Sequence, residues 1–90
     1  MQKLLSILLL LFISVITTAC INNFAVQELN NKAKEYLDKG DTQTAICRLK
    51  SSLDLDNTVY ETHYNLGIAY LNAKEYNEAI KHFDETLQLK

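Results

Sequence analysis

Residues 26–59 and 60–90 repeat one pattern at an offset of 34 positions. The matching residues are mostly small or apolar, and they are spaced like residues on one face of a helix. The identical pairs are Asn31 and Asn65, Tyr36 and Tyr70, Leu37 and Leu71, Ala45 and Ala79, Ile46 and Ile80, Leu53 and Leu87, and Leu55 and Leu89. A period of this length predicts two copies of one packing unit, because a repeat buries its apolar face against its neighbour.

Each copy predicts two helices joined by a tight bend. In the first copy, Gly40 suits a helix C-terminus and Asp41 suits the N-cap of the next helix. In the second copy, Lys74-Glu75 marks the bend, and Thr58 with Glu61 has the spacing of a capping box. The two stripes of helical spacing in that copy are His63, Leu66, Gly67 and Tyr70, and then Tyr76, Ala79, Ile80, Phe83 and Leu87.

The second copy resembles a tetratricopeptide repeat. Its motif reads His63-x2-Leu66-Gly67-x2-Tyr70 and then Ala79-x3-Phe83, although this family prefers a bulky aromatic residue at the place of His63. The first copy departs further, with Ala33 for the glycine and Lys32 where the family prefers leucine. The resemblance implies an all-α fold of two helix-turn-helix units, a fragment of a right-handed α-solenoid. Its packing signature falls on Ala33, Tyr36, Ala45, Leu49, Leu66, Gly67, Tyr70, Ala79 and Phe83.

Gly67 stands inside a predicted helix, where glycine costs about 1 kcal/mol relative to alanine. The resemblance implies that small residues let the paired helices approach closely, Gly67 against Ala79 and Ala33 against Ala45. Because the first copy already carries Ala33 at the equivalent place, we expect Gly67→Ala to be mild or favourable.

The N-terminal segment has the order of a bacterial lipoprotein signal, which it resembles. Lys3 precedes an apolar run from Leu4 to Ile16, and Ala19 stands directly before Cys20. The resemblance implies export to a bacterial cell envelope and a lipid anchor on Cys20. Two alternatives remain open at this stage: a secretory signal that is cut after Ala19, and an uncleaved anchor of marginal length.

The expected organisation follows from these two parts of the sequence. Residues 1–19 form the signal peptide, 20–25 a short linker, 26–59 the first repeat and 60–90 the second, which lacks the last few residues of a full unit. With only two repeats, we expect residues 20–90 to be marginally stable. They would gain stability from self-association, a bound partner or further repeats.

The sequence shows no pattern of catalytic or ligand-binding residues. The formal net charge of −2 gives no basic surface for nucleic acid, and two cysteines are too few for a metal framework. We expect His63 to be packed in the core, His82 to face solvent beside Phe83, and Cys47 to be partly exposed. We therefore expect no enzyme activity, cofactor, metal or small-molecule substrate.

The family resemblance implies recognition of another protein. Its concave surface, lined by the first helix of each repeat, holds a partner peptide or helix. By that resemblance the candidate groove residues are Asn30, Lys34, Leu37, Tyr64, Asn65, Ile68 and Leu71. Tyr64, Ile68 and Leu71 also form an apolar stripe that could instead pack on a neighbouring copy.

Three functions of different classes agree with this sequence. The first is a lipid-anchored envelope adaptor or assembly factor that binds a partner protein. The second is a structural role as the N-terminal part of a longer repeat protein. The third is an accessory or regulatory subunit of an envelope enzyme.

Overall fold

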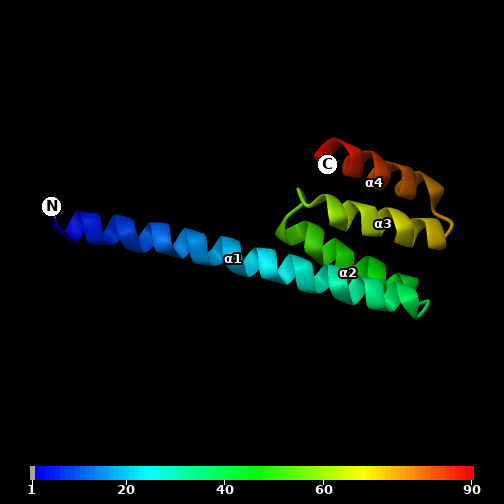
Figure 1. The fold of residues 1–90 in the computed structure, drawn as a ribbon, viewed down its shortest axis with the longest axis horizontal. Helices are drawn as coiled ribbons and strands as arrows, with labels where there is room; N and C mark the ends of the chain where they lie inside the picture. The colour runs from blue at the N-terminus through cyan, green and yellow to red at the C-terminus, as the bar shows by residue number, and fades with distance from the viewer. Residues whose placement is uncertain (1) are drawn as a thin grey trace.

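The computed structural model describes residues 2–90 apart from the side chain of Ala19, so this side chain and Met1 of the predicted signal peptide lie outside the described residues. This part of the chain is all-α, as predicted, and consists of two helix-turn-helix pairs (Figure 1). The helices are α1 (Gln2–Asp38), α2 (Thr42–Leu55), α3 (Tyr60–Asn72) and α4 (Tyr76–Leu89).

The second half of α1 pairs with α2, and α3 pairs with α4. Helix α3 also packs against α2 and touches α1, so it joins the two pairs. The first half of α1 extends away from the other helices, and the molecule is 60 Å long and 26 Å wide (Figure 1).

The turn between α1 and α2 confirms the predicted roles of Gly40 and Asp41. Gly40 has a φ of +80°, a conformation that favours glycine. The Asp41 amide donates to the Tyr36 carbonyl at 2.8 Å and the Gly40 amide to the Leu37 carbonyl at 3.1 Å, which is the Schellman arrangement. The Asp41 carboxylate then accepts from the Thr44 amide and caps α2.

The turn between α3 and α4 has the same hydrogen bonds but lacks the glycine. Lys74 takes the left-handed conformation, with a φ of 63°. The Glu75 amide donates to the Tyr70 carbonyl at 2.9 Å, and the Lys74 amide donates to the Leu71 carbonyl at 3.0 Å. The second repeat therefore carries backbone strain that Gly40 avoids in the first.

The predicted capping box at Thr58 and Glu61 is wrong. Helix α3 begins at Tyr60 with Val59 as its N-cap, and no side chain caps it. The Thr58 amide and hydroxyl instead donate to the carboxylate of Asp56, at 2.9 Å and 2.6 Å. The local Asp56 turn ends α2 and uses the Thr58 hydroxyl, so this hydroxyl does not accept from the first turn of α3.

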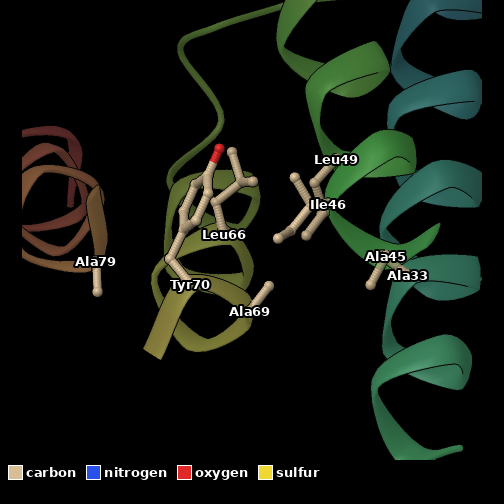
Figure 2. Packing of buried hydrophobic residues seen from close by; sticks show 8 residues of the cluster. All are labelled: Ala33, Ala45, Ile46, Leu49, Leu66, Ala69, Tyr70 and Ala79. Atoms are coloured by element: carbon tan, nitrogen blue, oxygen red, sulfur yellow. The ribbon is translucent and has the colours of Figure 1, made fainter. Parts of the chain in front are cut away.

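The core lies between α1, α2 and α3 and extends to the near side of α4 (Figure 2). All nine signature positions lie in it or against it. Buried members are Ala33, Ala45, Leu49, Leu66, Gly67, Tyr70 and Ala79, while Tyr36 and Phe83 are partly buried and pack on the cluster. Ile46 and Ala69 complete the buried set.

Helix α4 buries only part of the expected apolar stripe, namely Ala79 and, in part, Phe83. Its buried residues are Ala79, His82 and Thr86. Ile80 is 59% exposed and Leu87 is 75% exposed. The prediction that His82 faces solvent is therefore wrong. The small and polar residues can face α3 because their polar groups are satisfied there, and the Thr86 hydroxyl donates to the His82 carbonyl at 2.8 Å.

Gly67 faces the ring of Phe83, a neighbour that the expected packing against Ala79 did not include. A Cβ atom at position 67 would lie 2.5 Å from Cδ1 and 2.8 Å from Cζ of the Phe83 ring, and would also contact its Cε1. The helices therefore do approach closely at Gly67, but an aromatic ring fills the space that a side chain would need. The expectation that Gly67→Ala is mild does not agree with this geometry.

A buried polar cluster ties the first three helices together. Asn30 Nδ2 of α1 lies 2.8 Å from Thr62 Oγ1 of α3 and 3.3 Å from Ser52 Oγ of α2. Asn65 Nδ2 donates to Asn30 Oδ1 at 2.9 Å. Because hydrogen bonds demand specific partners, this cluster fixes the position of α3 against the first pair.

The N-terminal half of α1 is exposed along its apolar length. Residues 20–25, the predicted linker, are helical and continue α1 without a break. By length and composition this helix could cross a membrane, with a mean hydropathy of 2.7 over 18 residues, and a signal sequence would meet the same criterion.

Candidate functional site

A hollow of about 330 Å³ lies between α1 and α3 on the side of the bundle formed by the first helix of each pair. Helix α1 contributes three residues at helical spacing, and α3 contributes four. The lining residues are Lys34, Leu37, Asp38, Tyr64, Asn65, Ile68 and Asn72. We call this set the α1–α3 groove.

The structure brings five of the seven predicted groove residues into this hollow: Lys34, Leu37, Tyr64, Asn65 and Ile68. Asn30 does not line it, because its side chain is buried in the polar cluster with Asn65 and Thr62. Leu71 is about half exposed and lies outside the lining.

The groove combines an apolar floor with a few polar groups. Leu37 and Ile68 are half-buried there, and half of the Tyr64 surface is exposed. Lys34 and Asp38 bring opposite charges one helical turn apart, so the ionisable lining residues have no net charge. A surface of this kind suits a partner that offers apolar side chains and backbone polar groups.

Asn65 is buried at the groove, and one of its amide hydrogens already bonds Asn30. A hydrogen bond from Asn65 to a partner in the groove would therefore use its remaining amide hydrogen or its oxygen. A residue outside the groove holds the Tyr64 side chain in place. This residue is Phe83, whose ring centroid lies 6.2 Å from that of Tyr64 in a tilted contact.

Two groove residues, Asp38 and Asn72, were absent from the sequence prediction. Asp38 lies four positions after Lys34, and Asn72 lies four positions after Ile68, so each falls on the same helix face as a predicted residue. They are also equivalent to each other under the 34-residue offset. Helical spacing together with the repeat could have found both.

A pair of buried histidines joins α3 to α4. His63 Nδ1 and His82 Nδ1 lie 3.1 Å apart, and the ring centroids lie 5.3 Å apart. The distance between the centroids is close to the nitrogen–nitrogen distance plus the radii of the two rings. The two Nδ1 atoms therefore lie near the line that joins the ring centres and point toward each other. An in-line approach suits a shared hydrogen bond. On its other side His82 stacks on Tyr70, with centroids 5.6 Å apart.

The neighbours of the pair assign its protons. His63 Nε2 lies 2.8 Å from the Asn57 carbonyl, which can only accept, so this nitrogen carries hydrogen. Neutral His63 then accepts at Nδ1, and His82 Nδ1 donates. The nitrogen left to take a proton is His82 Nε2, which lies 4.0 Å from a Glu78 carboxylate oxygen.

Burial lowers the pKa of His82 below its ordinary value of 6.5. Electrostatic interactions with His63 and Lys81 lower the pKa further, while the Glu78 and Glu85 carboxylates raise it. The fold therefore favours neutral His82. Neutral His82 contributes fully to the stability of the fold above pH 6.5. This contribution is lost as the pH falls through the lowered pKa, because the unfolded chain then binds a proton that the folded chain resists.

The other candidate ligand residues are scattered. Within residues 2–90 no group of three or more His, Cys, Asp or Glu side chains could hold a metal ion. Cys20 and Cys47 are both exposed, and they lie on different helices. Exposure of Cys47 agrees with the sequence expectation.

Comparison with known proteins places one part of the chain in a family. A search of curated proteins found no match. The match to a family covers residues 60–90, about one third of the chain, and includes α3, its turn and α4. Tetratricopeptide repeats typically form protein–protein interaction modules rather than catalytic sites. Residues 60–90, which form the α3–α4 pair, match the family model of the tetratricopeptide repeat.

Proposed function

We propose that residues 26–90 bind a partner protein in the α1–α3 groove, and that the N-terminal segment holds them at a membrane. The proposal of partner binding rests on the α1–α3 groove. It is a hollow with an apolar floor and polar edges, formed by α1 and by α3, the first helix of the segment that matches the tetratricopeptide repeat family. Such repeats are typically interaction modules, and a peptide or an amphipathic helix fits this type of surface.

The membrane anchor is supported by the N-terminal sequence and by the exposure of the apolar run. Leu4 to Ile16 pack against nothing in the bundle, and each large apolar side chain in the run is about half exposed or more. Cys20 is exposed at the end of this stretch, where an acyl group could be attached. We propose an exported lipoprotein in a bacterial envelope, acting as an adaptor or assembly factor. Uncleaved anchoring and release as a soluble exported protein are outcomes that the test below separates.

Site-specific photocrosslinking tests the groove. A photoreactive phenylalanine analogue replaces Tyr64 in the groove or Tyr76 outside it, and these positions are 50% and 57% exposed in the same chain. We expect one discrete crosslinked product from position 64 and none of that size from position 76. Ile68→Asp should remove the product while leaving the helical circular dichroism unchanged. Equal products from both positions would refute the groove as the binding site.

Metabolic labelling with palmitate in a bacterial host tests the anchor. We expect incorporation into the wild type and into Cys47→Ser, but not into Cys20→Ser. If no form is labelled and all forms remain in the membrane, the anchor is the uncleaved helix. If no form is labelled and all are soluble, the chain is a secreted protein.

A further inference from the structure

The apolar surface of α1 continues beyond the predicted signal peptide to the edge of the repeat bundle. Ile21 is 61% exposed and Phe24 is 72% exposed, and Cys20 beside them is exposed as well. Only two residues later, Val26 is fully buried against the bundle. The exposed apolar surface and the buried core therefore meet within one helical turn.

These residues divide between two sides of the helix. At 3.6 residues per turn, Cys20, Ile21 and Phe24 fall on one side, whereas Asn22 and Val26 fall on the opposite side. Burial agrees with this division, because Asn22 is half-buried and Val26 is buried toward the bundle. We call Cys20, Ile21 and Phe24 the apolar collar. It faces away from the repeats.

The charge pattern identifies what covers the collar. Residues 4–27 contain no charged residue, and Lys3 and Glu28 bracket this stretch. In the uncleaved chain this stretch is about 36 Å long as a helix, which is close to the ~30 Å thickness of a bilayer core plus part of its interface. A solvent-exposed helix of this length would carry charges on its outer face. Continuity with the apolar run and the absence of charge point to lipid, and not to another protein.

We propose that the apolar collar lies in the lipid interface, so that the repeat bundle rests directly on the membrane surface. This rests on the membrane attachment proposed above, but not on its chemistry. With a lipidated Cys20, Ile21 and Phe24 insert beside the acyl chains. With an uncleaved helix, they form the last turn within the membrane. In both cases the bundle stands on the side of α1 that faces away from lipid.

The collar also sets the distance of the groove from the membrane. Lys34 lies ten residues after Phe24 on the same continuous helix, a rise of about 15 Å. No flexible linker separates the two, because residues 20–25 are helical. A partner that occupies the α1–α3 groove is therefore held close to the lipid headgroups, as a juxtamembrane segment of another membrane protein would be.

Tryptophan fluorescence tests the collar directly, because the chain contains no tryptophan. The full chain with Phe24→Trp is purified in detergent and reconstituted into phosphatidylcholine–phosphatidylglycerol vesicles. The matched control is Asn31→Trp, an exposed position on the same side of α1 about two turns further from the membrane. Lipids brominated on the acyl chains quench only tryptophans that reach the lipid, and iodide quenches those in water.

We expect the Phe24→Trp variant to have blue-shifted emission and to lose most of its fluorescence to brominated lipid, whereas iodide quenches the Asn31→Trp variant. Flotation of the vesicles separates the two proposals. If the Phe24→Trp protein floats but iodide quenches its emission, the collar is overturned and the anchor stays intact, and protein that does not float overturns both. Blue-shifted emission from position 24 that brominated lipid does not quench means that protein covers the collar, and this also overturns the proposal.

Discussion

Replacing Gly67 by alanine should destabilise the fold, although alanine is the better helix former. The added Cβ would lie 2.5 Å and 2.8 Å from two atoms of the Phe83 ring, where carbon atoms pack best at about 3.5–4.0 Å. The ring must therefore move by about 1 Å. Overpacking of this kind costs about 1–3 kcal/mol, and the gain in helix propensity is about 1 kcal/mol. We expect a net loss of about 1 kcal/mol.

The first repeat shows which second change should restore the packing. At the equivalent places it has Ala33 and Leu49, both fully buried in the core cluster. Ala33 is larger than Gly67, and Leu49 on the facing helix is smaller than Phe83 and has no ring. Gly67→Ala combined with Phe83→Leu therefore copies a pair that the chain already accommodates. The double variant should be more stable than the sum of the single effects predicts, by about 1–2 kcal/mol.

Urea unfolding of residues 20–90, followed by circular dichroism, measures all four members of this cycle. Phe83→Leu alone shows the cost of the lost ring and is the necessary control. The reasoning is refuted if Gly67→Ala equals or exceeds the wild type in stability. It is also refuted if the two changes are additive to within about 0.5 kcal/mol, the level found for residues that do not touch.

Five further results are expected. In urea unfolding, Lys74→Gly should stabilise the fold by about 0.5–1 kcal/mol, because glycine adopts the left-handed conformation without strain. Gly40→Ala should destabilise the fold by about 1 kcal/mol, because alanine is strained at the positive φ of this residue even though the space around it is open. Asn30→Leu should cost about 2–4 kcal/mol in the same assay because it leaves buried polar partners unpaired, and a loss below about 1 kcal/mol would refute the role of the polar cluster. Thermal melts should show stability falling as the pH drops below 6.5, with a shallower slope for His82→Gln; equal slopes would refute the assignment. On non-reducing gels, an exposed Cys47 should give oxidised dimers that Cys47→Ser abolishes.

Local and periodic features were predictable from the sequence. The Gly40–Asp41 turn needs only a residue that tolerates positive φ followed by a side chain that caps a helix. The 34-residue offset located the packing positions, because equivalent residues of a repeat occupy equivalent places. Most of the groove was predictable for the same reason, since Lys34 and Ile68 are equivalent residues on the first helix of each unit.

Features that depend on which partner a polar side chain finds were not predictable. Thr58 has the spacing of a capping residue, but Asp56 competes for its hydroxyl. Polarity alone places His82 on the outside and Ile80 on the inside. The structure reverses them, because His63 lies 19 positions earlier in the sequence and offers a hydrogen-bond partner. Burial of a polar residue depends on whether its partner is present, and a helical pattern does not record that.

The attachment of α4 explains why acid should affect the two ends of the bundle differently. Within residues 2–90, the backbone of α4 lies against α3 and no other helix, and His63–His82 is the buried side-chain hydrogen bond between them. Helices α1 and α3, which form the groove, are tied by Asn30, Thr62 and Asn65, none of which titrates. Protonation of His82 therefore weakens the attachment of α4 and leaves the groove helices joined. Tyr64 of the groove contacts Phe83 of α4, so a shift of α4 should change the surroundings of the Tyr64 ring, which its fluorescence or NMR signal would report.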